Sequence, residues 1–169
     1  DFGLVGHNGD VLGNPFHYRD ARTDGVMEKV FETIPKDELF AATGIQFMQF
    51  NSLFQLYAML GQQKDLLACA QHLLFMPDLF NYWLTGRKVC EFTNATTTQC
   101  FDTRRRAWAR PLLQRLSIPD QIFPEIVQPG TVLGELRAAV AEEAGIARLQ
   151  GKPGLPIIAP ACHDTGSAV

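Results

Sequence analysis

The chain has 169 residues, of which 46% are hydrophobic, so it is long enough for one domain with a sizeable core. The formal net charge is -3 and the only basic triplet is Arg104-Arg105-Arg106, which argues against a dedicated nucleic-acid surface. No apolar run approaches the roughly 18 residues of a membrane span, and the four cysteines are widely spaced, so we expect a cytoplasmic protein with reduced thiols.

The first expected element is a β-hairpin. Phe2–Val5 and Val11-Leu12 are apolar, and Asn8-Gly9 between them provides the two residues of positive φ that a type I′ turn requires. The hairpin predicts that a sheet begins at the start of the chain.

A polar loop follows from Pro15 to Gly25, with a high density of hydrogen-bonding side chains. Its arginines, Arg19 and Arg22, can present forked donors to hydroxyls or carboxylates. An internal Arg–Asp network that only holds the loop together explains the same residues equally well. The loop is therefore a candidate ligand-binding segment with a purely structural alternative.

Two helices are expected after this loop. Thr23 or Asp24 can cap the first, Pro35 separates it from the second, and Gly44 ends the second. The next segment, Gln46–Asn51, is expected to be extended. Its aromatic and amide side chains suit a sugar face and its hydroxyls, and they suit ordinary core packing as well.

Three further helices are expected: one capped by Ser52, one from about Lys64 to Phe75, and one from Pro77 to Gly86. Cys69 and His72 are three residues apart on the second of these, a spacing that could hold zinc. No second pair of ligands stands at a matching distance, so no metal site is predicted.

Val89–Phe92 is expected to form a short strand that is followed by a polar segment, Thr93–Gln99. The hydroxyls and amides of this segment can cap a helix or contact a ligand, and capping is the commoner outcome. The elements expected next are a helix at 108–116, a proline-punctuated loop at 118–129, a strand at 131–133 and an alanine-rich helix at 136–146.

The last stretch combines an apolar run with polar residues. Leu155–Ile158 predicts a buried strand, and His163-Asp164-Thr165 follows it. Open α/β sheets bind ligands at the carboxyl ends of their strands. An acid between a ring donor and a hydroxyl can take a proton from a substrate hydroxyl while its neighbours fix the substrate. Alternatively, Asp164 or Thr165 only caps the next helix.

Six stretches of the chain resemble, in order and in spacing, landmarks of one protein family. They are Tyr18–Gly25, Thr43–Phe47, Met76–Phe80, Tyr82–Gly86, Thr93–Gln99 and Cys162–Val169. These stretches are similar to the amino-terminal domain of rhamnulokinases, which are sugar kinases of the FGGY carbohydrate kinase family. The resemblance runs from Asp1 to Val169 and is weaker between 103 and 150.

The resemblance implies an α/β fold: the ribonuclease-H-like mixed sheet with packed helices of the actin-like ATPase superfamily. It implies that residues 1–169 form one sugar-binding domain, incomplete at both ends. The activity it implies is phosphorylation of a ketose by ATP with Mg²⁺, most closely of L-rhamnulose to the 1-phosphate in rhamnose catabolism. The ATP and Mg²⁺ sites are expected mostly outside these residues.

The resemblance also implies roles for individual residues. Asp164 is expected to be the general base, and His163 and Thr165 to hold the sugar. The resemblance also places Arg19 and Asp20 near the sugar, and the amide side chains of Gln46 and Asn94 make these two residues further candidates for sugar contact. The alternatives are a kinase of a related sugar of the xylulose or fuculose type, an acid–base hydrolase built on His163 and Asp164, or a non-catalytic sugar-binding domain. No nucleic-acid or membrane partner is expected.

Overall fold

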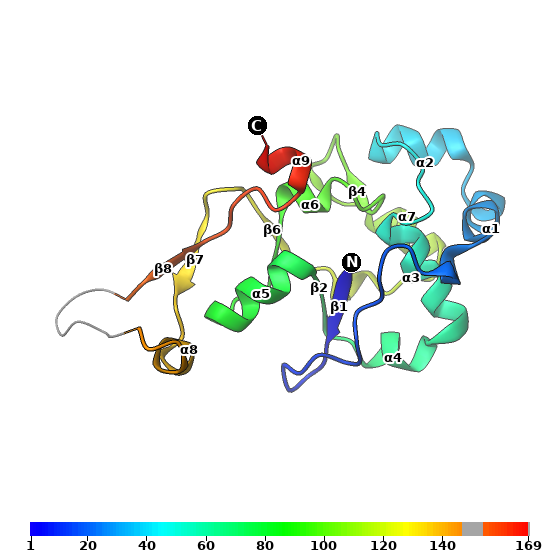
Figure 1. Ribbon diagram of the computed structural model, residues 1–169. Coiled ribbons are helices and arrows are strands. Elements are labelled where there is room, and N and C mark those ends of the chain that lie inside the picture. Colours follow the sequence, from blue (N-terminus) through cyan, green and yellow to red (C-terminus); the bar gives the residue numbers. More distant parts are fainter. Residues whose placement is uncertain (147–153, 169) are drawn as a thin grey trace.

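The first strand, β1 (Phe2–Val5), is apolar throughout, and all of its residues are buried. It pairs antiparallel with β2 (His72–Phe75), so that Phe2 lies opposite Phe75 and Val5 opposite His72. The computed structural model describes residues 1–146 and 154–168 (Figure 1). The helix expected from Lys64 to Phe75 is wrong in its second half. It ends at Cys69 as α4 (Lys64–Cys69), because the apolar residues after it are buried against β1.

The expected hairpin at the start of the chain is confirmed, but its turn type is wrong. Val5 and Val11 form an antiparallel bridge, and the Leu12 N–H donates to the Leu4 carbonyl at 2.7 Å. Gly9 has a φ of 87°, whereas the φ of Asn8 is not positive, so the type I′ turn does not form. The glycine alone provides the left-handed residue that the turn needs.

A parallel pair lies beside these strands. β3 (Val89–Glu91) pairs with β6 (Glu125–Val127), and β6 lies inside the segment 118–129, which the sequence predicted as loop. The prediction was wrong because the prolines of this segment flank β6 and do not interrupt it. Both antiparallel and parallel strand pairs thus occur together with helices, and the expected α/β class is confirmed. The other short elements of this region are β4 (Phe101–Asp102), β5 (Ala107–Trp108) and the 3₁₀ turn η2 (Asp120–Ile122).

The helix ends follow the glycine and proline signals better than the cap signals. Gly44 and Gly86 end their helices in the left-handed conformation, as predicted, and Pro35 separates the first two helices. Gly25 precedes the first helix in place of the predicted Thr23 or Asp24 cap. The helices are α1 (Val26–Thr33), α2 (Lys36–Thr43), α3 (Ser52–Gln62), α5 (Met76–Thr85), α6 (Phe92–Ala95), α7 (Arg110–Arg115), α8 (Ala138–Glu143) and α9 (Asp164–Ser167), with a 3₁₀ turn η1 (Ala21–Thr23).

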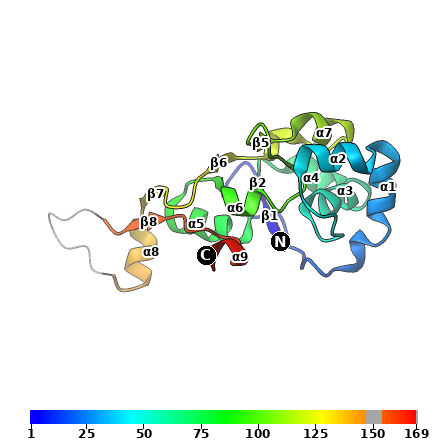
Figure 2. The same ribbon diagram turned by 90° about the horizontal axis from the view of Figure 1, so that it is seen from above.

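The main core lies where α3 meets its neighbours. Leu53, Phe54 and Leu56 of α3 are fully buried, and Figure 2 shows α1, α2, α3, α4 and α7 gathered at one end of the molecule. Full burial of such a side chain contributes about 1.5–3 kcal/mol. None of the helices among residues 1–146 and 154–168 is both long and apolar enough to cross a membrane.

The pair formed by β7 (Val132–Glu135) and β8 (Pro156–Ile158) extends away from this core, with α8 beside it (Figures 1 and 2). The expectation of a buried last strand is therefore wrong. Ile158 is 50% exposed and Leu155 is 52% exposed, because β8 pairs only with β7 in the described part of the chain. After β8 the chain returns to the body, and α9 lies against α6.

Candidate functional site

Asp164 borders a cavity of about 520 Å³. The cavity lies where six segments meet: the first residue of the chain, the polar loop at Tyr18, the loop before α3, the start of α5, the α6 region and the start of α9. Its hydrogen-bonding walls come from Asn51, Ser52, Asn94 and Thr97. A cavity with an exposed acid, several amides and hydroxyls is suited to a polar ligand that carries hydroxyl groups.

The sequence-predicted residues divide between those that border this cavity and those that lie elsewhere. His163, Asp164 and Asn94 border it. Thr165 lies next to the predicted base, and its N–H donates to Asp164 Oδ1 at 2.7 Å. His163 Nε2 lies 3.4 Å from the same oxygen, so both neighbours of the carboxyl group face it.

Arg19 borders a neighbouring cavity of about 530 Å³, which shares Tyr18 with the first. The Nε of Arg19 donates to the Tyr18 hydroxyl at 2.9 Å. Asp20 instead caps η1, where its Oδ1 accepts the Arg22 N–H at 2.9 Å. Gln46 is exposed, and its backbone carbonyl oxygen accepts a hydrogen bond from the Asn51 side chain. Asp20 and Gln46 are therefore not in the lining of the cavity.

Arg22 holds the polar loop against α3. Its Nη2 donates to Gln55 Oε1 at 2.8 Å, and its guanidinium lies 4.0 Å from the centre of the Phe16 ring. Burial lowers the pKa of Arg22, while the charge of Asp20 raises it. The loop is thus anchored internally, as the alternative of an internal network proposed. The partners of Arg22 in this anchor are Gln55 and the Phe16 ring, in place of the aspartate that was expected.

The aromatic wall of the cavity was not predicted as a unit from the sequence. Tyr18 and Phe50 both border it, and their rings meet edge to face with centroids 5.6 Å apart. Aromatic rings pack well against the apolar face of a sugar. The aromatic character of the segment Gln46–Asn51 was visible in the sequence, but its pairing with Tyr18 was not, because the two segments are distant in the chain.

A buried hydrogen-bonded group, which was also not predicted from the sequence, holds the residues before Asp164. Glu91, at the end of β3, is fully buried. Its Oε1 accepts the Thr93 N–H at 2.8 Å, and its Oε2 accepts the Cys162 N–H at 2.9 Å. The Thr93 hydroxyl also donates to Glu91 Oε2 and accepts the His163 N–H at 3.1 Å. The backbone of the residues before the predicted base is therefore tied to a strand of the interior.

Asp78 lies behind this group and is also fully buried. Its Oδ1 accepts the Glu91 N–H at 3.0 Å, whereas Oδ2 has no hydrogen-bond partner in the described part of the chain. Burial raises the pKa of Asp78 to about 7, although the hydrogen bond from the Glu91 N–H opposes the rise. Burial likewise raises the pKa of the Cys162 thiol to about 12, so this cysteine is no thiolate nucleophile at neutral pH.

Asp78 provides a test of this buried cluster through the pH dependence of stability. Between its ordinary pKa of 3.8 and about 7, the folded protein binds more protons at Asp78 than the unfolded chain does. Ionisation of Asp78 therefore lowers the free energy of unfolding progressively across this window, and the loss is constant above it. Asp78→Asn removes this loss and keeps an oxygen that accepts the Glu91 N–H. The free energy of unfolding of the variant, relative to that of the wild type, is therefore expected to be higher at pH 8 than at pH 4.

The measurement is the difference in Tm between variant and wild type at each pH from 4 to 8. The difference should grow in favour of the variant up to about pH 7 and then level off. Asp37→Asn, an exposed substitution on α2, is the matched control and should show no such trend. A Tm difference that is the same at every pH would contradict an ionisable buried Asp78.

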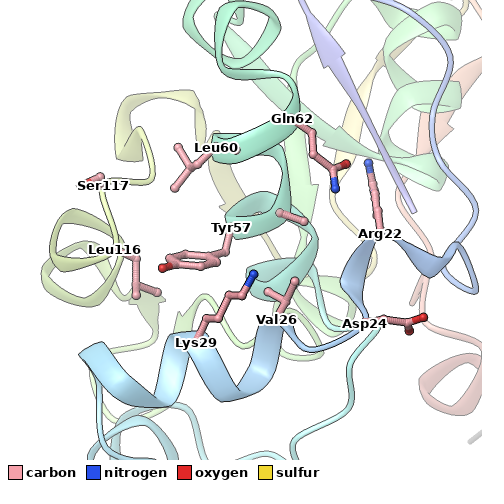
Figure 3. A pocket seen from close by; sticks show the side chains of 11 residues that line it. Arg22, Asp24, Val26, Lys29, Tyr57, Leu60, Gln62, Leu116 and Ser117 are labelled. Carbon is pink, nitrogen blue, oxygen red and sulfur yellow. The ribbon is translucent and has the colours of Figure 1, made fainter.

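A cavity of about 590 Å³ lies apart from Asp164, between α1, α3 and the residues after α7 (Figure 3). Lys29 from α1 and Tyr57 from α3 line it, and it contains none of the predicted sugar-site residues. The Nη1 of Arg22, which also lines it, has no hydrogen-bond partner among the residues described. Asp24 also lines it, but none of His163, Asp164 and Thr165 does, so the candidate site is the cavity at Asp164.

Cys69 and His72, the pair with zinc-like spacing, do not share a helix, because Cys69 ends α4 and His72 begins β2. Within residues 1–146 and 154–168, no group of three or more histidine, cysteine, aspartate or glutamate side chains could hold a metal ion.

Comparison with known proteins decides the family. Residues 2–169 match the FGGY family of carbohydrate kinases, N-terminal domain. The chain belongs to this FGGY family. The chain is 43% identical over 169 residues to the rhamnulokinase of Halalkalibacterium halodurans and to that of Oceanobacillus iheyensis. All of the chain is covered in both cases, but only 35% and 34% of those proteins, so the chain spans about a third of the length of these curated relatives.

Solved structures of sugar kinases share the fold. The gluconate kinase from Lactobacillus acidophilus matches with a TM-score of 0.82 at 19% identity, covering 94% of this chain and 31% of that one. The xylulose kinase from Rhodospirillum rubrum matches with a TM-score of 0.82 at 20% identity, covering 94% and 32%. At these identities the likeness concerns the fold alone. With the family match, it confirms the expected fold of an amino-terminal FGGY kinase domain.

Proposed function

We propose that this chain is the sugar-binding part of an ATP-dependent sugar kinase that phosphorylates a ketose, most specifically L-rhamnulose to L-rhamnulose 1-phosphate. Membership of the FGGY family and the identity to relatives named rhamnulokinase support the proposal. The observation that carries it is Asp164, whose side chain is 94% exposed and which borders a cavity that is also lined by residues with amide, hydroxyl and aromatic side chains.

In this proposal Asp164 takes the proton from the sugar hydroxyl that becomes the nucleophile. The hydroxyl oxygen then forms a bond to the γ-phosphorus of ATP, and the bond between that phosphorus and the ADP oxygen breaks. His163 and Asn94 border the same cavity and are assigned to the sugar hydroxyls. Thr165 orients the carboxyl group through its N–H, and Tyr18 and Phe50 provide a face for the sugar ring.

The residues present do not fit the triphosphate or its metal ion. The described lining of the cavity contains no lysine or arginine, and the sequence contains no G-x-x-x-x-G-K-[ST] loop. The described residues also hold no cluster of metal ligands. We therefore assign ATP and Mg²⁺ binding to parts of the enzyme outside this chain, which spans 35% of its relative from H. halodurans. We propose a cytoplasmic location for the enzyme, where ATP is available.

The sugar is tested with a panel of ketoses. The full-length enzyme is assayed for ADP release with ATP and L-rhamnulose, L-fuculose or D-xylulose, and a reaction without sugar gives the background. We expect kcat/KM for L-rhamnulose to exceed that for each other ketose by about tenfold or more, because misplaced hydroxyls leave buried polar groups unpaired.

Each alternative has its own outcome in this panel. A higher kcat/KM with another ketose would overturn the assignment of L-rhamnulose and keep the kinase. Cleavage of a glycoside or ester substrate, added to the panel without ATP and measured by release of its leaving group, would indicate the acid–base hydrolase instead. Sugar binding without any turnover in the full-length protein would indicate a non-catalytic binding domain.

A further inference from the structure

The segment that carries Asp164 is held from the interior by two residues outside the cavity lining, Glu91 and Thr93. We propose that they form a hydrogen-bonded clamp that positions Asp164 for proton transfer. The inference rests on the proposed function, and it assigns Glu91 and Thr93 as positioning residues of the same site.

The clamp begins at a rigid point. Glu91 is the last residue of β3, where it lies opposite Val127 of the parallel strand β6, and its side chain is fully buried. The carboxyl group of Asp78 accepts the Glu91 N–H at 3.0 Å and so fixes the backbone at this position. A buried residue held by a strand pair and by a side chain can transmit a fixed position to whatever it binds.

The carboxyl group of Glu91 uses both oxygens and bridges two segments. Oε1 accepts the Thr93 N–H at 2.8 Å, which is an ordinary cap for α6. Oε2 accepts the Cys162 N–H at 2.9 Å, from a residue 71 positions away in the chain. Oε2 also accepts the Asn94 N–H at 3.4 Å as a second, longer part of the cap. Capping α6 requires no bond to Cys162, so Oε2 holds the segment before Asp164 in addition to the cap.

Thr93 extends the clamp by one residue. Its hydroxyl donates to Glu91 Oε2 and accepts the His163 N–H at 3.1 Å. The two N–H groups immediately before Asp164 are thereby held, one by Glu91 and one by Thr93. Gly166 of α9 lies close to the same side chain, since a Cβ at that position would be 3.3 Å from Thr93 Cβ. The start of α9 is therefore fixed on Thr93 by hydrogen bonding and by contact.

Asp164 needs such a support because its own side chain is 94% exposed. Packing does not fix an exposed carboxyl group, and its position follows from the backbone that carries it. Displacement of a reacting group by about 1 Å can cost about 100-fold in rate. Loss of the clamp is therefore expected to lower kcat more than it weakens sugar binding, which several other cavity residues share.

The test compares Thr93→Val with Thr93→Ser in the full-length enzyme. Valine has nearly the shape of threonine but cannot accept the His163 N–H or donate to Glu91, whereas serine keeps the hydroxyl. We expect Thr93→Val to lower kcat about 10- to 100-fold with a change in sugar KM of less than about threefold. Thr93→Ser should stay within about threefold of the wild-type kcat.

Thr96→Val is the matched control. The Thr96 hydroxyl donates to the Thr93 carbonyl at 2.8 Å, so it belongs to the same turn, but it neither borders the cavity nor contacts residues 162 and 163. Its kcat should remain close to wild type. Thermal unfolding of all variants shows whether each is folded at the assay temperature, and Thr93→Ala replaces the valine variant if valine prevents folding.

Amide hydrogen exchange of residues 162–164 supplies a measurement that does not depend on turnover. Thr93→Val should speed the exchange of the His163 amide, and Thr93→Ser should not. Unchanged exchange, a Thr93→Val enzyme with wild-type kcat, or a serine variant as impaired as the valine variant would each overturn the clamp. Failure of the proposed function looks different: the wild type itself would show no sugar-dependent ADP release, while the exchange result would still decide the clamp.

Discussion

Replacing Asp164 with asparagine is expected to lower the kcat of the full-length enzyme by at least about 100-fold, since a general base contributes typically 10²–10⁴ in rate. Asparagine keeps the shape of the side chain and an oxygen that can accept the Thr165 N–H, which Asp164 Oδ1 accepts at 2.7 Å. The amide cannot take up the proton of the sugar hydroxyl. The affinity for the sugar should change far less, because the other walls of the cavity are unaltered.

The measurement is kcat with ATP and L-rhamnulose, together with sugar affinity from direct binding. Asp37→Asn makes the same change of charge at an exposed position of α2 that does not border the cavity, and it should leave kcat unchanged. An Asp164→Asn enzyme that retains more than about a tenth of the wild-type kcat would show that another group accepts the proton.

Local signals in the sequence predicted the helix boundaries that depend on one residue. Gly44 and Gly86 end α2 and α5 because a left-handed residue at these positions needs no partner elsewhere in the chain. Pro35 separates two helices for a reason that is equally local. The side-chain caps were less predictable, since Asn51, before α3, uses its amide to reach Gln99 at 2.8 Å instead of capping the helix.

The strands were harder to predict because their partners are distant. β2 was predicted as helix, and only its antiparallel pairing with β1, some 70 residues away, makes it a strand. β6 was assigned to a loop for the same reason, since it is a strand through its pairing with β3. The burial predicted for β8 failed because an apolar run does not say whether a second layer will cover it.

The candidate site divides in the same way. His163-Asp164 could be proposed from the sequence because the motif is contiguous and the resemblance to FGGY kinases implied a role, and both residues border the cavity. The aromatic pair Tyr18 and Phe50 was not found, because it is formed by two loops that meet only in the folded chain. Glu91 was read as part of a strand, since nothing in the sequence shows that its carboxyl group reaches residue 162.

These residues, purified alone, are expected to show no sugar-dependent ADP release. The described wall of the cavity at Asp164 offers no lysine or arginine to a triphosphate, and the chain spans 35% of the length of its relative from H. halodurans. Phosphoryl transfer depends mainly on positioning and on stabilisation of charge. Without residues that fix the γ-phosphate, the attacking hydroxyl and the phosphorus are not held in line. The part of the barrier lowering that comes from positioning, up to about 7–11 kcal/mol, is then lost.

The measurement is a coupled assay of ADP release with L-rhamnulose at high protein concentration, and the full-length enzyme is the positive control. Circular dichroism must first show that the isolated chain has the helices and strands of the structure. The same sample carrying Asp164→Asn separates true activity from a contaminating kinase, since a contaminant would not respond to the substitution. ADP release that requires both the sugar and Asp164 would overturn the prediction. It would mean that these residues bind ATP themselves, and the cavity at Asp164 would then have to hold the γ-phosphate of ATP as well as the sugar.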